Sequence, residues 1–174
     1  MKPGTLPQEV DIRALAARGA EVAGSITEED LPRLLGSDVS LCEPADVLFK
    51  FSRDDEGRYT AEITLLGVLK LKCQRCLCGM HHPVNVNSLM ACVWNDDEAS
   101  VLPQNYEPLL VGEMADLRSI AEEEVLLSVP VSATHDFDCR SEAQLAALDL
   151  KEAGSNSPQK PRDNAFSILA HIKL

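Results

Sequence analysis

The strongest constraint on the fold is a stretch of strict alternation between residues 61 and 73. Every second residue there is apolar or small, and threonine, glutamate and lysine fill most of the positions between. Because successive side chains of a strand point to opposite faces, this pattern predicts a β-strand with one buried face. Gly67, in the middle of the run, predicts a bulge or bend. The positions of the buried face are Ala61, Ile63, Leu65, Gly67, Leu69, Leu71 and Cys73.

Two further extended segments flank this strand. A polar turn at residues 53–58 joins it to an extended run from Ala45 to Phe51, which predicts a hairpin. At its other end the strand runs directly into a cysteine cluster, and a second alternating run follows. The cluster is therefore expected at the turn of a second hairpin. The second run places Val84, Val86, Met90, Cys92 and Trp94 on one face.

Helical patterns occur on both sides of these strands. Residues 12–18 favour a helix, and Thr27, followed by acids and leucines, predicts a capped second helix over 27–35. The N-terminal quarter is thus expected to be mostly helical and to add little to the deep core. Residues 95–100 predict an acidic loop, and a helix is expected from Asp116 to near Pro130. The predicted fold class is α+β, an antiparallel sheet strongly bent at Gly67 with helices packed on one face.

A change in composition divides the chain near residue 150. Residues 1–150 are expected to form a single α+β domain, and 151–163 contain almost no apolar residues, which predicts a flexible linker. Residues 164–174 predict a short C-terminal helical segment in which Asn164 is the N-cap and Phe166, Leu169 and Ile172 share an apolar side. Such a segment either recognises a partner or packs back onto its own domain.

The net charge of −12 restricts the kinds of partner that the chain can bind. A field of this sign repels phosphates and attracts basic proteins, ribosomal proteins among them. No apolar run approaches the ~20 residues of a membrane helix, and residues 1–10 lack the order of a signal peptide. We therefore expect a cytoplasmic protein without membrane contact, in which the six cysteines stay reduced.

The cysteine cluster is the one pattern with metal-binding spacing. Cys73 and Cys76 form half of a zinc knuckle, because two thiolates at this spacing can face one tetrahedral ion. His135 and Cys139, which follow the long helix, could supply the other two ligands for Zn²⁺. The alternative is that the cysteines are reduced and pack without metal. Other ligand candidates near the pair are Cys78, His81 and His82.

Charged residues elsewhere suggest three further roles. Lys70, Lys72 and Arg75 could contact RNA phosphates from one strand, although an ordinary solvent-exposed face explains them as well. Glu124 falls on the apolar side of its helix and therefore needs a partner, for which Arg75 is the first candidate. His135 and Asp136 could act as a general base in a hydrolase, but no nucleophile or nucleotide motif accompanies them. An enzyme is therefore not expected.

Three blocks together resemble the YceD family of large ribosomal RNA subunit accumulation proteins. They are LKCQRCL at 71–77, EEEVLLSVP at 122–130 with His135 and Asp136 after it, and NAFSILA at 164–170; YEP at 106–108 fits the same pattern. Two departures occur: Ala165 stands where the family usually has proline, and the region after His135 lacks the extra cysteine pairs of some relatives. The second departure weakens the zinc interpretation.

The resemblance implies a non-catalytic ribosome biogenesis factor that supports synthesis, processing or stability of large-subunit (23S) ribosomal RNA. It also implies association with ribosomes, since bacterial genes of the family commonly neighbour that of a large-subunit ribosomal protein. The expected partner is a large-subunit ribosomal protein or a pre-ribosomal particle, and contact with rRNA would then be indirect. Direct binding to structured RNA is the main alternative, and a hydrolase is the weaker one.

Overall fold

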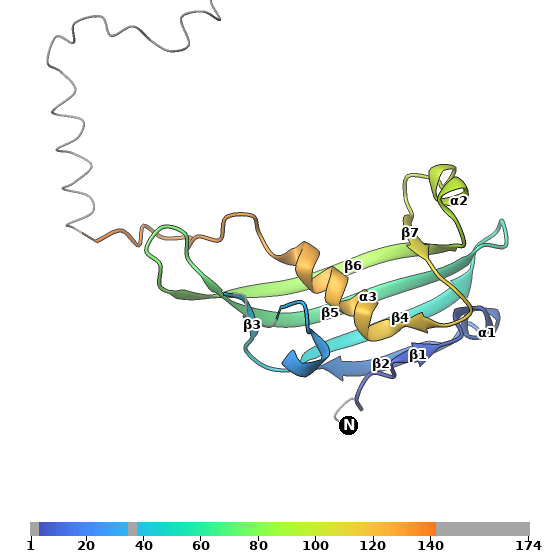
Figure 1. The fold of residues 1–174 in the computed structure, drawn as a ribbon, viewed down its shortest axis with the longest axis horizontal. Coiled ribbons are helices and arrows are strands. Elements are labelled where there is room, and N and C mark those ends of the chain that lie inside the picture. The colour runs from blue at the N-terminus through green and yellow to red at the C-terminus, as the bar shows by residue number, and fades with distance from the viewer. Residues whose placement is uncertain (1–3, 35–37, 142–174) are drawn as a thin grey trace, which may run out of the picture. The chain divides into compact units, whose positions relative to one another are not determined.

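The computed structural model describes residues 4–34 and 38–141. Inter-residue contacts divide the chain into two units, Met1–Asp136 and Phe137–Leu174, and every named element belongs to the first. The predicted linker at 151–163 and the predicted helical segment at 164–174 lie outside the described residues. The α+β class is confirmed, because a large sheet and a few helices make up the first unit (Figure 1).

The main sheet has six strands, with the order β2-β4-β5-β6-β7 and with β3 paired to β5. Its pairs are antiparallel, as predicted, except that β7 lies parallel to β6. Both expected hairpins are present, since β4 is followed by β5 and β5 by β6. The strands are β2 (Glu21–Ile26), β3 (Ser40–Leu41), β4 (Ala45–Arg53), β5 (Tyr59–Lys72), β6 (Gly79–Val93) and β7 (Glu107–Leu110); β1 (Glu9–Val10) and β8 (Ala115–Asp116) pair separately.

All of the helices except α3 are short. They are α1 (Ile12–Ala17), the 3-10 helix η1 (Glu28–Asp30), α2 (Asp96–Ser100) and α3 (Leu117–Ser128). The predicted helix at 116–130 is confirmed as α3, in whose first turn Arg118 N and Ser119 N donate to the Asp116 carboxylate at 2.9 and 3.0 Å. No helix within the described ranges is long and apolar enough to span a membrane.

The prediction for the N-terminal quarter was partly wrong. The helix over 27–35 is reduced to η1, because Pro32 disfavours helical geometry at Leu31, whose φ and ψ are −121° and 62°. Strand β2 was missed because only two of its six residues are buried, so it lacks a clear apolar alternation. This region also adds to the deep core, since Leu6, Ile26 and Leu31 are fully buried.

The core lies between one face of the sheet and the helices α1 and α3. On β4 and β5 the odd-numbered residues point into it, and Phe49 and Phe51 stack with their ring centroids 5.9 Å apart. α3 contributes Leu117, Ala121 and Val125, which are fully buried. The alternation that predicted a one-sided strand therefore identified the buried face of the sheet correctly.

Gly67 does not cause a bulge. The β5–β6 register continues through it, pairing Gly67 with Val84 and Val68 with Pro83. A Cβ atom at this position would lie 2.8 Å from the Cβ of Ala45, at the start of β4. The glycine is therefore required by the close approach of β4, beyond which β3 replaces β4 as the neighbour of β5.

Candidate metal centre

The cysteine cluster forms the loop between β5 and β6. The loop is closed by two backbone hydrogen bonds, in which Cys73 N donates to Cys78 O and Leu77 N donates to Cys73 O, both at 2.9 Å. Leu77 has a φ of 62°, which is a left-handed conformation that leucine rarely adopts. The tight closure of the loop maintains this conformation and turns the side chains of Cys73 and Cys76 to where they can share a ligand.

Three candidate ligands meet within the first unit. Cys73 is fully buried, Cys76 and His135 are half-buried, and the ligand atoms of the three all lie within 4.8 Å of one another. Cys76 Sγ is 3.5 Å from His135 Nδ1. Sulfur and nitrogen ligands of one tetrahedral zinc ion are separated by about the same distance, roughly 3.5 Å.

Backbone contacts hold His135 beside the loop. Gln74 N donates to Ala133 O at 2.7 Å, and Arg75 Nη2 donates to His135 O at 3.2 Å. Within the loop, Arg75 N donates to Cys73 Sγ at 3.4 Å. The chain after α3 is thus fixed against the loop by bonds that do not involve the ligand atoms themselves.

These residues could hold a metal ion, because the thiols and the imidazole are the donors that zinc prefers. The fold therefore brings together three of the four predicted ligands, although His135 lies 59 residues after Cys76 in the sequence. The fourth, Cys139, belongs to the second unit and follows His135 by four residues. The other candidates, Cys78, His81 and His82, are not members of the group.

Cys78 differs chemically from the two ligand cysteines. Its side chain is exposed, and its thiol lies 3.7 Å from the Cys76 carbonyl oxygen. Its hydrogen bond to Cys76 raises the pKa of the Cys78 thiol, and the proximity of the other two thiols acts in the same direction. Cys78 is therefore suited to remain a protonated thiol while Cys73 and Cys76 bind an ion.

The predicted RNA-binding cations do not form one uniform group. Lys70 and Lys72 are exposed on the same face of β5, with His81 opposite Lys70 on β6. Lys72 Nζ lies 3.8 Å from an Asp38 carboxylate oxygen. Arg75 instead supports the cysteine loop through its bond to the His135 carbonyl.

Glu124 is buried, with 5% of its surface exposed, but the predicted partner was wrong. Its carboxylate accepts a hydrogen bond from Ser88 Oγ at 3.0 Å, and no ion pair of Glu124 occurs within the described ranges. Burial raises the pKa of Glu124 above its ordinary value, and the carboxylates of Glu107 and Glu123 act in the same direction. The neighbouring Glu122 is also buried and accepts from Arg33 N at 2.6 Å.

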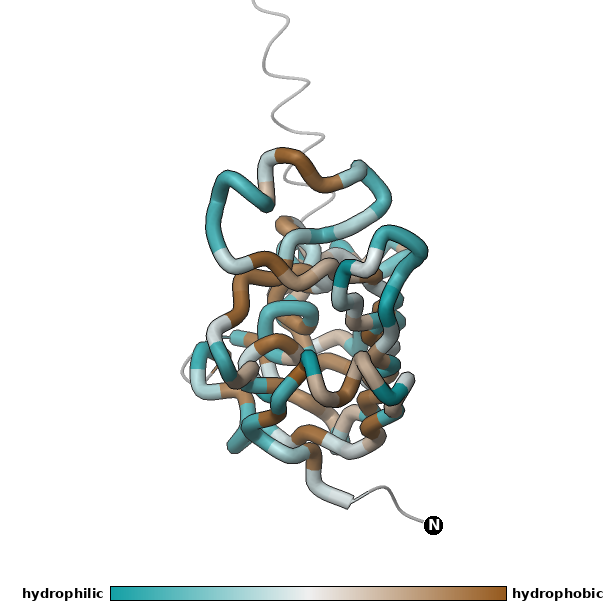
Figure 2. Tube along the Cα trace, turned by 90° about the vertical axis from the view of Figure 1, so that its right-hand side faces the viewer, coloured by the Kyte–Doolittle hydropathy of each residue, from teal (hydrophilic) through white to brown (hydrophobic). Residues whose placement is uncertain are grey.

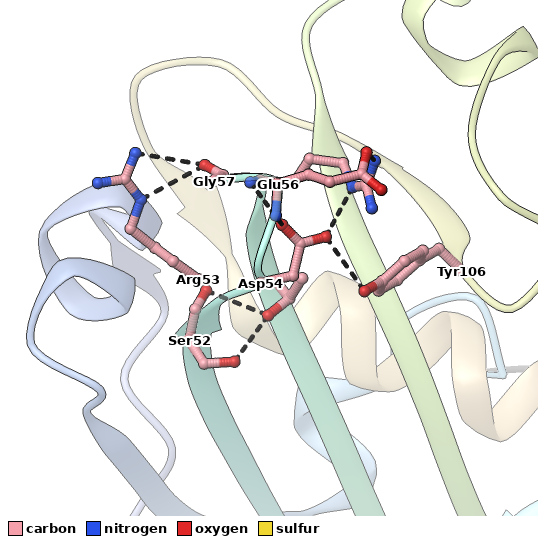
Figure 3. Close-up of polar contacts among 8 residues, drawn as sticks. Ser52, Arg53, Asp54, Glu56, Gly57 and Tyr106 are labelled. Atoms are coloured by element: carbon pink, nitrogen blue, oxygen red, sulfur yellow. Dashed lines mark hydrogen bonds and ion pairs between the residues drawn. The ribbon is translucent and has the colours of Figure 1, made fainter.

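Sequence reasoning missed a second polar centre, at the β4–β5 turn (Figure 3). Asp54 accepts from the Arg58 backbone at 2.8 Å, from the Arg58 guanidinium at 2.7 Å and from the Tyr106 hydroxyl at 3.1 Å. Partial desolvation tends to raise the pKa of Asp54, but these hydrogen bonds outweigh it and the pKa falls below its ordinary value. The polar turn was visible in the sequence, whereas its contact with Tyr106, 52 residues away, was not.

Asn164, Phe166, Leu169 and Ile172, which were expected to bind a partner, lie outside the described residues.

Comparisons with known proteins agree with the motif pattern. A family model described as "Large ribosomal RNA subunit accumulation protein YceD" matches residues 61–173. A Haemophilus influenzae protein named "Large ribosomal RNA subunit accumulation protein YceD" is 28% identical over 177 residues, which cover 99% of each chain. No solved structure is significantly similar to this chain.

Proposed function

The chain belongs to the YceD family of large ribosomal RNA subunit accumulation proteins, and from this membership we propose that it supports the accumulation of 23S ribosomal RNA as a non-catalytic binding factor. The observation that carries the proposal is the family match, which spans the cysteine loop, α3 and the C-terminal block. The chain would act in the cytoplasm on a large-subunit ribosomal protein or a pre-ribosomal particle.

The geometry around His135 supports binding rather than hydrolysis. Its Nδ1 lies 3.5 Å from the Cys76 sulfur, and this contact supports a role as a metal ligand rather than as a general base toward a substrate. The segment containing His135 and Asp136 is also bonded to the cysteine loop through Ala133. A structural role explains both contacts.

The proposed cofactor of this role is zinc. Cys73, Cys76 and His135 would supply three ligands, and Cys139 is the fourth ligand that the sequence predicts for a closed tetrahedral site. A bound zinc ion would add crosslinking energy and no reactivity, since a site with four protein ligands leaves no position for substrate. The protein's own contribution is to direct the Arg75 amide at Cys73 Sγ and to hold the segment of His135 beside the loop through the Gln74–Ala133 bond.

The partner is inferred from charge. A chain with a net charge of −12 attracts the basic proteins of the ribosome and is repelled by bare rRNA. The chain would therefore associate with rRNA only through a bound ribosomal protein. The C-terminal segment at 164–174 is proposed as one recognition element.

An affinity purification from cells, performed with and without ribonuclease, tests the proposal. We expect large-subunit proteins to remain bound after ribonuclease treatment, and we expect depletion of the chain to lower 23S rRNA relative to 16S rRNA. Loss of every ribosomal protein upon ribonuclease treatment would contradict protein-mediated binding. Unchanged 23S rRNA upon depletion would contradict the function itself.

Direct RNA binding remains a second candidate because Lys70 and Lys72 share an exposed face. If this surface bound rRNA, affinity for 23S fragments would fall steeply with salt and would vanish in a Lys70→Glu, Lys72→Glu, Arg75→Glu variant. Because Arg75 also supports the loop, the double lysine variant is the cleaner measurement.

A further inference from the structure

A cleft at the end of the sheet opposite the cysteine loop has no role in the function proposed above. Its volume is about 390 Å³, and it lies between the β4–β5 turn and the segment formed by α2 and the residues after it. In Figure 1 both segments lie at the same end of the sheet, and Figure 2 looks onto that end, where hydrophobic and hydrophilic stretches alternate. We call it the α2 cleft; its lining includes Glu56, Arg58, Tyr59, Trp94, Glu98, Val101 and Leu102.

The floor and one wall of the α2 cleft are apolar. Val93 and Cys92 are buried beneath it, and the aromatic rings of Tyr59 and Trp94 meet edge to face with centroids 6.1 Å apart. Val101 lines the cleft with 78% of its surface exposed. A valine this exposed beside an indole leaves apolar surface that an incoming aliphatic side chain could cover.

The rim of the α2 cleft is formed by the two segments that border it and is acidic, and Glu56 and Glu98 are the carboxylates among its lining residues. The turn at 53–58 and the segment at 95–100 together carry six carboxylates and two guanidinium groups. One of the two, that of Arg58, is already paired with Asp54 and Glu56. A cation approaching the cleft therefore meets an excess of negative charge that the protein itself does not neutralise.

Both acidic segments are fixed before any partner arrives. Glu98 accepts from Trp94 N at 3.0 Å and from Asn95 Nδ2 at 3.0 Å, and Asn95 in turn accepts from Glu98 N. Across the cleft, Asp54 joins the turn to Tyr106 (Figure 3). A preorganised rim lowers the ordering cost of binding.

We propose that the α2 cleft binds a basic protein segment, in which one aliphatic side chain fills the pocket beside Trp94 and Val101 while flanking lysine or arginine residues face the acidic rim. The occupant is inferred from charge complementarity, because an apolar pocket within an acidic rim matches an aliphatic residue between cations. The proposal rests on the proposed function, since it specifies the chemistry of the ribosomal protein surface that such a factor would recognise.

Trp94 supplies a direct measurement, because it is the single tryptophan of the chain. Its Nε1 is buried and has no hydrogen-bond partner within the described residues, while Arg13 lies 4.4 Å from the ring centroid. The ring is thus held by packing, and filling the cleft would change its surroundings. The probes are two synthetic peptides of lysine and arginine that differ only in a central leucine or alanine.

We expect the leucine peptide to shift the Trp94 fluorescence and to bind the full chain at least about 10-fold more tightly than the alanine peptide, given the free energy of burying one leucine. Val101→Asp should remove this difference. The matched control is Val131→Asp, the same substitution at a fully exposed valine that does not line the cleft. Equal affinity of both peptides, or equal loss in both variants, would overturn the proposal.

The acidic rim has its own test. Asp96→Asn with Asp97→Asn should weaken the leucine peptide several-fold and flatten its salt dependence. Glu28→Gln with Glu29→Gln, which also neutralises two adjacent acids in the first turn of a short helix, should leave both unchanged. The same losses in both variants would show that only net charge attracts the peptide, and the cleft would not be the site.

A photoreactive residue at position 101 separates this inference from the proposed function in cells. A crosslink to a basic segment of a large-subunit protein supports the inference. Ribosomal proteins could copurify equally well with the native chain and with Val101→Asp, without any crosslink. In that case the cleft proposal fails and the proposed function stands. If no ribosomal protein copurifies while the leucine peptide still binds at Val101, the proposed function fails and the cleft remains a basic-peptide site. A crosslink to RNA would contradict the proposal that the cleft binds a basic protein segment.

Discussion

Glu124 shows how a single buried carboxyl can lower stability at neutral pH. Below its ordinary pKa the group is protonated in both the folded and the unfolded chain, and it costs nothing. As the pH rises, the unfolded chain ionises first because burial raises the pKa in the folded state. The folded state therefore loses stability between the ordinary pKa and the raised one, and the loss persists at pH 7.

Replacing the group with glutamine should restore that stability. Glu124→Gln keeps an acceptor for Ser88 and cannot ionise, so we expect its melting temperature at pH 7 to exceed that of the native chain by about 2–4 °C, which corresponds to roughly 1 kcal/mol for a protein of this size. Below about pH 4 the two should coincide. Glu123→Gln, at a side chain 61% exposed, is the control. A pH-independent difference would show that the folded and unfolded chains bind the Glu124 proton equally, so that the folded protein does not raise its pKa.

Leu77 carries backbone strain that substitution with glycine can release. Its φ of 62° costs leucine about 1–2 kcal/mol, whereas glycine adopts it freely, and the side chain is already 63% exposed. Leu77→Gly should therefore raise stability by about 0.5–1 kcal/mol in thermal unfolding. Leu127→Gly, at an exposed leucine inside α3, should instead lower it. A loss at both positions would mean that the Leu77 side chain makes contacts that outweigh the strain.

At the scale of elements, the cysteine loop should depend on metal. We expect one zinc ion per chain by native mass spectrometry and its loss in Cys73→Ser, accompanied by a lower melting temperature. Cys78→Ser, in the same loop but outside the ligand group, should keep the ion and the stability. If the protein is purified without chelator and is stable but contains no metal, the cysteines only pack as reduced thiols and the zinc prediction is wrong.

The elements differ in how well the sequence predicts them, for physical reasons. The faces of β5 and β6 follow from alternation because each buries one side against the same core. Strand β2 lies at the sheet edge and buries too little to show the pattern, so its pairing with β4 depends on tertiary structure. The loop predicted at 95–100 was wrong, because residues 96–100 form α2, for which a signal existed. Asn95 is a favoured N-cap residue, and its side chain does accept from Glu98 N.

The candidate site was predictable to a similar degree. The spacing of Cys73 and Cys76, with His135 after α3, was enough to predict three residues that the fold brings together. Partners fixed only by tertiary contact could not be predicted, and two of the three acids in the run 122–124 show this. Glu122 reaches Arg33 N across 89 residues, and Glu124 reaches Ser88 across 36. These separations are unrelated to the short periods of helices and strands, so no sequence pattern could have revealed the two contacts.

At the scale of the whole molecule, the two ends of the sheet differ in charge. One end carries the cysteine loop, where Lys70 and Lys72 are exposed, and the other carries the acidic α2 cleft. A net charge of −12 makes long-range attraction to basic surfaces the first step of any encounter. The rate of association with the proposed ribosomal partner should therefore fall markedly as the salt concentration rises from about 0.05 to about 0.3 M. Over this range the electrostatic screening length falls below about 10 Å. A rate independent of salt, measured by stopped flow, would contradict this.

The C-terminal segment at 164–174 is proposed as a second recognition element. Residues 151–163 contain too few apolar groups to be drawn into a core, whereas Phe166, Leu169 and Ile172 recur at helical spacing. Truncation after Lys160 should then leave the melting temperature unchanged while removing copurifying ribosomal proteins and lowering 23S rRNA. In the full chain, Leu169→Asp should reproduce the loss, and Leu127→Asp, at a leucine 77% exposed on α3, should not. If the truncated chain unfolds or aggregates, the segment belongs to the core, and the recognition role falls with it.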